Sequence, residues 1–552
     1  MRWFWLVGLL AGREACAQAT PPVPAPTSTL AERVDAVTNA REYAGAHWGM
    51  LVVDLATGRP VFERNPDQLF CPASVTKLFT TAAALNELGA DYRFKTPVVR
   101  RGVVKDGTLD GDLILIARGD LCLGGRTGPD GSLLFEDGDH SYGNGTLVPV
   151  DPLAGLVHLA REVHASGIRA VTGDVIVDDR LFEPAASTGS GPSRVSPAVI
   201  NDNIIDVVVA PGAKAGEPAK VRFVPETAFA SADVRVETTA EGSGAASIQV
   251  RAVGPRRFTV RGKIPAGHKP VNDTYEVDEP AAFARSLFIE TLRSRGVAVP
   301  AASPLGDNPV ARLAPRAEVA ALPTVAEYTS PPLREYVRVI LKVSQNLHAS
   351  TLPLILAAKN GETTLDKGLK VEAEALKKLG VDVEALSFGG GAGGDRADLA
   401  TPRATVALLR AMAARPDFAA YDAALPVLGR DGTLARAVPP ESPARGHAHA
   451  KTGSYWVNNP LTGHAVLTSK ALAGYLETAS GKRLAFAFYV NDAPSRAIAP
   501  TVSEAAQVTG RRLGHLCEIF YDDAEPAPAP APAPAEPATP APPAADPTKA
   551  GR

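Results

Sequence analysis

The sequence predicts an α+β fold in which both ends of the chain form one domain and the middle is inserted into it. Two observations indicate this arrangement. Helix and strand patterns alternate near both ends, whereas residues 96–320 carry short β-prone runs separated by Gly, Asp and Pro turns. The 552 residues also suffice for two to four domains. We therefore expect an antiparallel sheet with helices built from both ends, with two mostly β domains inserted.

The N-terminal part predicts a hairpin followed by a helix. Residues 47–64 contain a β-prone run, a turn at 56–59 and a returning strand. Apolar residues between Val75 and Leu85 then recur at helical spacing. A weaker helix pattern at 152–167 interrupts the β-rich middle.

The C-terminal part predicts helices and strands in alternation. The expected elements are helices at 331–365, 401–416 and 500–519, a strand at 447–453, and a hairpin that turns at Ser480-Gly481. Residues 28–95 and 321–523 are thus expected to be two parts of one domain around the insertion at 96–320. The net charge of −3 gives no electrostatic reason to expect nucleic-acid binding.

The two termini carry patterns that do not belong to the fold. Residues 1–19 resemble a signal peptide, with a short apolar run and A-x-A-like cleavage sites, so we expect export to the periplasm or cell wall. A lipid anchor at Cys16 is an alternative, although Arg13 and Glu14 do not suit it. No later stretch is apolar enough to span a membrane. Residues 524–552 form a Pro/Ala-rich tail without core-forming residues.

The cysteine count leaves the pairing open. Cleavage of the signal would leave Cys71, Cys122 and Cys517, an odd number, so one disulfide is possible and the sequence does not choose the pair. Cys71 lies three residues before Ser74 and is a rival nucleophile. No histidine lies nearby in the sequence, and a structural cysteine is the simpler interpretation.

The segment "PASVTKLF" contains the first catalytic motif. Ser74 lies at the N-cap or in the first turn of the expected helix, and Lys77 follows it on the same face. A lysine faces an unfavourable dipole at a helix N-terminus, which argues against a purely structural first turn. S-x-x-K alone is nevertheless common by chance.

Two further motifs follow in order. Ser344-Gln345-Asn346 lies within the helical segment 331–365, and Lys451-Thr452-Gly453 opens a strand. Glycine there would let a ligand backbone lie along the strand edge. S-x-x-K, S-x-N and K-T-G in this order are the signature of penicillin-recognising serine acyl transferases.

The chemistry accounts for these residue types. Ser74 is the expected nucleophile, and Lys77 is its base if burial and a second cation, Lys451, lower its pKa. Ser344 would relay a proton to the leaving amine while Asn346 holds the substrate amide. Lys451 and Thr452 would bind the terminal carboxylate of the substrate. The backbone N–H of Ser74 would form part of an oxyanion hole.

With these motifs, the chain resembles the class C low-molecular-mass penicillin-binding proteins, the D-alanyl-D-alanine carboxypeptidase/endopeptidase family. The segments that carry the resemblance are "PASVTKLFTTAAAL", "GDLILIARGD", "INDNIIDVVVAPG", "KVSQNL", "TPRATVALL", "GRDGTLARA", "AKTGS" and "ALAGYLETASGKRLAFAFYVN". The distance of about 270 residues between Ser74 and Ser344 matches the insertion typical of that family.

The resemblance implies a penicillin-binding transpeptidase-like domain from both chain ends, with two inserted domains. It implies peptidoglycan stem peptides as substrates, β-lactams as covalent inhibitors at Ser74, and no cofactor. Two segments depart from the family pattern: the loop "SFGGGAGGDRADLATPR" lacks the usual aspartate and serine, and the connection at 454–470 is longer than usual. Both bear on substrate preference.

Other motifs have simpler interpretations. Gly389-x-Gly391-x-x-Gly394 matches a dinucleotide fingerprint, but Pro402 follows too soon for a crossover, so we expect a flexible loop. His447-x-His449 would need a third ligand to bind a metal. Asp431 is expected to support the site from a turn. Asp202 and Asn203 are expected to be turn and capping residues.

Two rival functions remain at this point. A β-lactamase or esterase would use the same motifs, and a non-catalytic wall-binding scaffold would use the same fold. The sequence also leaves open the balance of carboxypeptidase and endopeptidase activity, the diamino acid of the stem peptide and the oligomeric state.

Overall fold

The computed structural model describes residues 28–522. The predicted signal peptide at 1–19 and the tail at 524–552 lie outside these residues. Among the described residues, no helix has the length and apolar character needed to cross a membrane.

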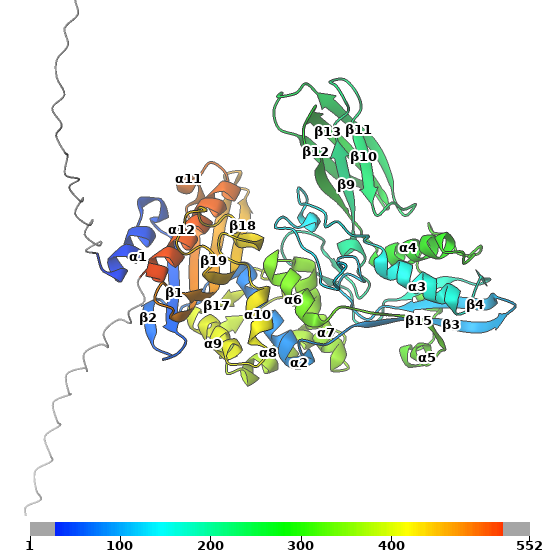
Figure 1. Ribbon diagram of the computed structural model, residues 1–552, viewed down its shortest axis with the longest axis horizontal. Coiled ribbons are helices and arrows are strands. Elements are labelled where there is room, and N and C mark those ends of the chain that lie inside the picture. Colours follow the sequence, from blue (N-terminus) through cyan, green and yellow to red (C-terminus); the bar gives the residue numbers. More distant parts are fainter. Residues whose placement is uncertain (1–27, 523–552) are drawn as a thin grey trace, which may run out of the picture.

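A five-stranded antiparallel sheet joins the two ends of the chain, as Figure 1 shows. Its strand order is β18-β19-β20-β1-β2. The strands are β1 (His47–Asp54), β2 (Pro60–Arg64), β18 (Ala448–Asn459), β19 (His464–Glu477) and β20 (Arg483–Ala493). Because β1 pairs with β20 over its whole length, residues more than 400 positions apart in the sequence are neighbours in the sheet.

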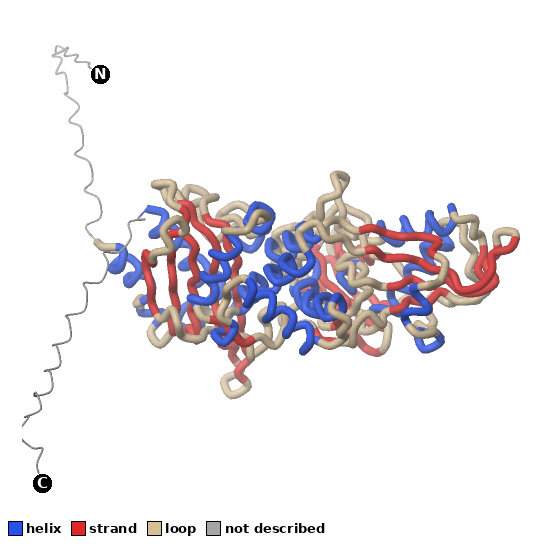
Figure 2. Tube along the Cα trace, turned by 90° about the horizontal axis from the view of Figure 1, so that it is seen from below, coloured by secondary structure: helices blue, strands red, loops and turns tan. Residues whose placement is uncertain are grey.

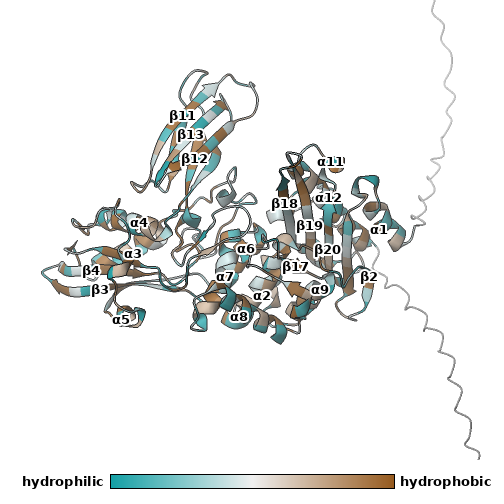
Figure 3. Cartoon of the chain, turned by 180° about the vertical axis from the view of Figure 1, so that it is seen from behind, coloured by the Kyte–Doolittle hydropathy of each residue, from teal (hydrophilic) through white to brown (hydrophobic). Residues whose placement is uncertain are grey.

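Alternating side chains of this sheet enter two different cores. In β20, Phe486 and Phe488 face a core that includes helix α12 (Val502–Asp522), whereas Ala485 and Ala487 face a core on the opposite side. Central strands buried on both faces carry nearly continuous apolar sequence, as "LAFAFYV" does here. Figure 3 shows hydrophobic residues along these strands.

Helices cover both faces of the sheet. On the α12 side lies α1 (Leu30–Thr38). The opposite side holds α2 (Thr76–Leu88), α6 (Leu333–Lys342), α7 (Asn346–Lys359), α8 (Leu365–Lys378), α9 (Pro402–Ala413) and α10 (Phe418–Ala424). In Figures 1 and 2 the helices of this second layer lie between the sheet and the inserted region.

The inserted region begins with a second sheet in the order β15-β3-β4-β5, with β6 paired to β4. Its strands are β3 (Lys95–Lys105), β4 (Thr108–Ile116), β5 (Ala170–Val171), β6 (Val175–Asp178) and β15 (Thr324–Thr329). Helices α3 (Ala154–Ala165) and α4 (Pro280–Ser294) pack on it. Since β15 pairs with β3, this sheet extends a few residues beyond the expected boundary at 320.

Residues 204–276 of the insertion project away from the body of the molecule (Figure 1). They form two three-stranded sheets, β10-β9-β14 and β11-β13-β12. The strands are β9 (Ile204–Ala210), β10 (Lys220–Val224), β11 (Ser231–Thr239), β12 (Ser247–Gly254), β13 (Arg257–Pro265) and β14 (Val271–Glu276). The mixed architecture with inserted β domains is therefore the expected one.

Short elements connect these parts. They are the 3-10 turns η1 (Arg41–Tyr43), η2 (Ala73–Val75), η3 (His140–Tyr142), η4 (Asn201–Asn203), η5 (Val310–Arg312), η6 (Val383–Ala385) and η7 (Gly432–Leu434), the helices α5 (Arg316–Ala320) and α11 (Ser495–Ile498), and the strands β7 (Ala185–Ala186), β8 (Arg194–Val195), β16 (Leu386–Ser387) and β17 (Leu399–Ala400).

One expectation about a loop is wrong. Residues 454–470 do not form a long loop, because β18 and β19 continue their pairing out to Asn459 and His464. Only four residues lie between the two strands. The extra length is a hairpin extension that carries Tyr455 and Trp456 beside the cleft described below.

Candidate active site

Ser74 lies in η2, immediately before α2 begins at Thr76. Of the two expected placements, the N-cap is wrong because Val75 occupies it, whereas the first-turn placement agrees with a 3-10 turn that runs directly into α2. The Ser74 Oγ instead accepts a hydrogen bond from Lys77 Nζ at 2.9 Å. Ala73, just before it, has φ +46°, a left-handed conformation that costs energy in a residue other than glycine. The backbone is thus strained at the residue next to the hydroxyl.

Lys77 is fully buried beneath this turn. Besides Ser74, its Nζ contacts Asn346 Oδ1 and the carbonyl oxygen of Ala392, both at 2.6 Å. Burial lowers the pKa of Lys77 to about 7, and the nearby Asp398 carboxylate opposes that shift. An amine with this pKa has a substantial neutral fraction near pH 7, so it can accept the proton of the serine hydroxyl.

Ser344 and Asn346 lie at a break between α6 and α7, rather than inside one helix as expected. Ser344 has φ +63°, which turns the chain sharply between the two helices. Asn346 Oδ1 accepts from Lys77, and its Nδ2 donates to the carbonyl of Ser190 at 2.8 Å. Because both ends of the amide have partners, the side chain is fixed beside the lysine.

Lys451, Thr452 and Gly453 lie on β18, the edge strand of the first sheet. A Cβ atom on Gly453 would lie only 2.5 Å from the carbonyl oxygen of Pro72. The close approach of β18 to the η2 turn therefore explains the glycine, and the ligand contact that the sequence suggested stays a prediction. This approach brings the K-T-G motif next to Ser74.

The Lys451 amine is completely buried and donates to the Thr452 carbonyl at 2.8 Å. Burial lowers its pKa well below the usual value, and the neighbouring Lys77 and Lys470 lower it further. Burial also lowers the pKa of Lys470 to about 8. Among the described residues, neither Lys451 nor Lys470 forms an ion pair. The region therefore holds cationic groups without a counter-charge.

A cleft of about 690 Å³ opens above these residues. Both ends of the chain and the inserted region contribute to its walls. The lining residues are Ser74, Asp137, Gly138, Asp139, Tyr142, Gly143, Asn144, Gly145, Gly189, Ser190, Val343, Ser344, Asn346, Gly393, Gly394, Thr433, Thr452, Ser454, Tyr455 and Trp456. The structure thus brings Ser74, Ser344, Asn346 and Thr452 to one cavity, with Lys77 and Lys451 buried below it.

The glycine-rich loop that the sequence marked as flexible is packed against the site. A Cβ atom on Gly393 would lie 1.9 Å from the Ala73 carbonyl, and one on Gly391 would lie 2.3 Å from the Ala349 carbonyl. Its glycines are required by close packing, so both the flexible-loop and the dinucleotide interpretations fail. The backbone of Gly389 also donates to Asp398 at 2.8 Å. Burial raises the pKa of Asp398 to about 6.

Sequence reasoning missed several residues of the site: Tyr142, Ser190, Ala392, Asp398 and Thr433. Tyr142 acts through its hydroxyl and Ser190 through its carbonyl in segments without a recognisable motif, and Ala392 acts through its carbonyl in the glycine-rich loop, where the side-chain type gives no signal. Thr433 belongs to the "GRDGTL" turn and accepts a hydrogen bond from Thr452 Oγ1 at 2.8 Å. The signal for it was the neighbouring Asp431, which binds Lys342 at 2.7 Å and supports the turn as expected.

The structure gives no support to the alternatives of a cysteine nucleophile, a disulfide or a metal site at His449. Burial raises the pKa of the Cys71 thiol, which disfavours the nucleophilic thiolate. Cys71, Cys122 and Cys517 are all free thiols, so the possible disulfide does not form among them. His449 Nδ1 lies 2.9 Å from Asp422 Oδ2 and belongs to no group of metal-ligand type found among residues 28–522.

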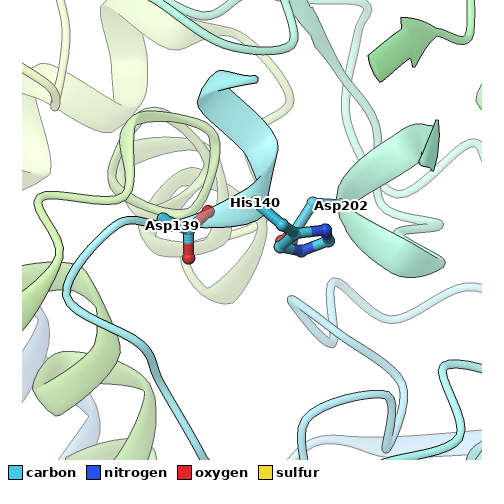
Figure 4. A group of neighbouring side chains, drawn as sticks. All are labelled: Asp139, His140 and Asp202. Carbon is cyan, nitrogen blue, oxygen red and sulfur yellow. The ribbon is translucent and has the colours of Figure 1, made fainter. Parts of the chain in front are cut away.

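One cluster of ligand-type side chains does occur there, formed by Asp139, His140 and Asp202 (Figure 4). Arg126 Nη2 lies 2.8 Å from Asp139 Oδ2 and also contacts Asp202. The guanidinium therefore already supplies the positive charge that a metal would bring, and the cluster is a buried ion-pair network.

Comparison with known proteins agrees with this geometry. The model of the D-Ala-D-Ala carboxypeptidase 3 (S13) family matches residues 30–511. A D-alanyl-D-alanine carboxypeptidase of Actinomadura sp. is 34% identical over 462 residues, covering 79% of this chain and 78% of the relative. D-alanyl-D-alanine carboxypeptidase DacB of Haemophilus influenzae is 23% identical over 466 residues, covering 81% and 86%.

The fold agrees as well. The crystal structure of penicillin binding protein 4 from Haemophilus influenzae superposes with a TM-score of 0.66 at 21% identity, covering 89% of this chain and 99% of that one. The same protein has been solved in complex with a β-lactam. From the arrangement of the three motifs, the family match and the relatives together, we conclude that the chain belongs to the D-Ala-D-Ala carboxypeptidase 3 (S13) family of serine peptidases.

Proposed function

We propose that this enzyme cleaves D-alanyl-D-alanine-type bonds in peptidoglycan stem peptides through an acyl-enzyme at Ser74. One observation carries the assignment of the nucleophile: the buried Lys77 amine donates to Ser74 Oγ at 2.9 Å, and its pKa is about 7. A neutral amine at that position is the base that a serine needs, because serine is a weak nucleophile at its own pKa.

In the proposed reaction, Ser74 Oγ attacks the carbonyl carbon of the scissile amide while its proton moves to Lys77 Nζ. The tetrahedral intermediate collapses when the C–N bond breaks, and the leaving amine takes up a proton through Ser344. Water then attacks the acyl-enzyme ester, releases the product acid and restores the Ser74 hydroxyl. Asn346, fixed beside Lys77, would hold the substrate amide during acylation.

The Ser74 backbone N–H is available for the oxyanion. Ser74 is the second residue of the η2 turn, where an N–H group has no acceptor within the turn. A hydrogen-bond donor at this position can stabilise negative charge that develops on the carbonyl oxygen.

The substrate carboxylate is assigned to the K-T-G strand. Thr452 offers a hydroxyl in the cleft, the buried Lys451 and the partly buried Lys470 lie behind it, and neither amine has an acidic partner among the described residues. A bound carboxylate would supply the missing counter-charge. Gly453 would contribute by allowing β18 to approach Ser74.

The cellular setting follows from the substrate. Peptidoglycan lies outside the cytoplasm, and residues 1–19 match a signal peptide, so we place the enzyme in the periplasm or at the cell wall. β-Lactams should acylate Ser74, since their strained amide resembles the D-Ala-D-Ala bond. We also retain the division into a two-part domain, 28–95 and 321–523, around the insertion at 96–320, with β15 of the second part pairing with β3 of the inserted sheet.

Digestion of purified peptidoglycan fragments tests the proposal. The parent enzyme, Ser74→Ala and the remote control Ser166→Ala are compared by mass spectrometry. We expect loss of one D-alanine from pentapeptides, cleavage of cross-linked dimers, or both. Ser74→Ala should reduce either activity by at least about 10³-fold, while Ser166→Ala keeps it.

The same samples separate the rival functions. Rapid turnover of a β-lactam with no effect on peptidoglycan would favour a β-lactamase. Retention of the parent and of Ser74→Ala on wall material, with no product from either, would favour a scaffold. If Ser74→Ala digests fragments at the parent rate, the assignment of the nucleophile is wrong.

A further inference from the structure

The turn that carries Ser344 and Asn346 is held from the inserted region. The Tyr142 hydroxyl donates to the Ser344 carbonyl at 2.6 Å and accepts from the Asn346 backbone N–H at 3.0 Å. Gln345, between them, donates from Nε2 to Ser141 Oγ at 2.9 Å. Two consecutive residues of η3 thus contact all three residues of the S-x-N motif.

This turn needs an external partner. Asn346 is the first residue of α7, and the N–H groups of a first helical turn have no acceptor within the helix. Ser344 has a left-handed backbone, which persists in a residue other than glycine only when the surroundings enforce it. A single hydroxyl satisfies a donor and an acceptor on either side of the strained bend. Burial raises the pKa of Tyr142, so the hydroxyl keeps the proton that it donates.

A buried charge network anchors η3 in turn. Asp139 caps η3 by accepting from the Ser141 N–H at 3.0 Å. Figure 4 shows His140 of the same turn beside Asp202, to which it bonds at 2.9 Å. Asp202 also accepts from His348 on α7 at 2.7 Å, so one carboxylate links η3 to α7, the helix that begins at Asn346. Since these groups are almost completely buried, the position of Tyr142 is well determined.

We propose that Tyr142 is a positioning residue for catalysis, one that fixes Ser344 and Asn346 relative to Lys77. The inference rests on the proposed roles of those two residues. Asn346 Oδ1 is 2.6 Å from Lys77 Nζ, so a displaced turn would move the groups that contact the base and the leaving amine. A misplacement of about 1 Å can lower a rate roughly 10²-fold.

The substitution Tyr142→Phe tests this role because it keeps the ring and removes only the hydroxyl. The substrate is a minimal acyl-D-Ala-D-Ala peptide, and rates are expressed per active site titrated with fluorescent penicillin, so unfolded molecules do not count. We expect kcat to fall about 10- to 100-fold while KM changes less than about 3-fold. A residue that merely supports the fold would lower the number of titratable sites and leave the rate per site unchanged.

The matched control is Tyr475→Phe. Tyr475 is buried where Tyr142 is partly buried, and like Tyr142 it donates to a backbone carbonyl, that of Leu409 at 2.8 Å, but in the sheet and outside the cleft. This variant should keep the parent kcat per titrated site. Gln345→Met removes the second contact with η3 together with the cap that Gln345 Oε1 provides to the Leu347 N–H at 2.8 Å, and it should also lower kcat per titrated site.

The outcomes separate this inference from the proposed function. If Ser344→Ala and Asn346→Ala lower kcat but Tyr142→Phe stays within about 3-fold of the parent per titrated site, the positioning role is wrong and the proposed mechanism stands. If Ser344→Ala and Asn346→Ala also leave kcat unchanged, the roles assigned to those residues fail, and the positioning role fails with them.

Discussion

Two buried groups of charged side chains occupy neighbouring parts of this enzyme, and they differ in how their charges are compensated. The lysine cluster, beneath the cleft, consists of Lys77, Lys451 and Lys470. The ion-pair network, in and beside the inserted region, consists of Arg126, Asp139, His140, Asp202, Asp206 and His348. The first cluster bonds to neutral oxygens, whereas the second pairs each carboxylate with a cation or a histidine.

The pKa values follow this difference. Burial lowers the pKa of all three lysines, to about 7 for Lys77. Burial alone would raise the pKa of Asp202, but Arg126 and the two histidines outweigh it and hold that pKa well below the usual value. Burial would likewise lower the pKa of His140, yet its bonds to Asp202 and Asp206 raise it to about 10.

The comparison distinguishes side chains suited to proton transfer from side chains that maintain the structure. A buried charge without a counter-charge sits near the point where it gains or loses a proton, which is what a base requires. A fully paired network keeps its charges across the neutral range, and its contribution is geometric specificity. In this enzyme the second arrangement supports the first, because the network anchors η3 and η3 contacts the S-x-N turn.

The largest expected effect is on catalysis. Lys77→Met should lower the rate of acylation by a labelled penicillin at least about 10³-fold, since it removes the base. The free energy of unfolding at pH 7 should not fall, because an apolar side chain of similar size replaces a buried amine whose desolvation outweighs its attraction to Asp398. Acylation and urea unfolding measure the two effects.

An exposed lysine provides the control for this variant. Lys367 lies at the surface of α8, where it pairs with Glu362, and Lys367→Met should alter neither the acylation rate nor the unfolding midpoint. A Lys77→Met enzyme that acylates within about tenfold of the parent rate would show that another group is the base.

The second expected effect is on stability. Asp202→Asn removes the charge that pairs with Arg126 and His140, so Arg126 keeps only Asp139 and His140 keeps only Asp206 as a buried counter-charge. The free energy of unfolding should fall by about 3–5 kcal/mol, measured by urea denaturation.

Asp233→Asn is the matched control, because Asp233 also pairs with an arginine, Arg261, but at the exposed surface of β11. This control should leave the unfolding midpoint unchanged. If the two variants lose equal stability, the buried network stabilises the fold no more than an exposed ion pair does. The network would then not differ from the lysine cluster in the way described above.

The sequence allowed the residues that meet at the site to be predicted better than the geometry that holds them. The three motifs identified Ser74, Lys77, Ser344, Asn346, Lys451 and Thr452 because acyl transfer restricts those positions to few residue types. Helical periodicity continues across residues 331–365, so it gave no sign of the bend at Ser344. That bend depends on a hydroxyl about 200 positions away, which no local pattern can reveal.

The residues of the inserted region that support the site could not be predicted from the sequence, for the same reason. Asp202 was interpreted as a turn residue, and it does lie in a 3-10 turn with φ +51°, but its three ion-pair partners come from distant segments. The glycine-rich loop was misjudged because glycine signals both mobility and close packing. Only the tertiary structure, with Ala73 against Gly393, decides between them.

The smallest expected effect concerns pH. As pH rises, the contributions of Lys77 and His140 to stability should change in opposite directions. Lys77 has a folded pKa near 7, below the unfolded value of about 10.5, so the unfolded state binds more protons between these limits and stability rises with pH. His140 has a folded pKa near 10, above its unfolded value of about 6.5, so the folded state binds more protons and stability falls as pH rises. Each group contributes up to about 1.4 kcal/mol per pH unit.

Urea unfolding between pH 7.5 and about 9.5 measures these slopes in the parent, Lys77→Met and His140→Gln. Relative to the parent, Lys77→Met should make the slope of stability against pH more negative, and His140→Gln should make it more positive. Groups that interact with neither side chain cancel in the differences, whereas Lys451 and Asp202, whose pKa values depend on Lys77 and His140, contribute to them. Equal slopes would mean that neither group changes its proton binding on unfolding. A shift of the same sign in both variants would mean that the lysine cluster is compensated as fully as the ion-pair network, which would remove the physical basis for assigning Lys77 as the base.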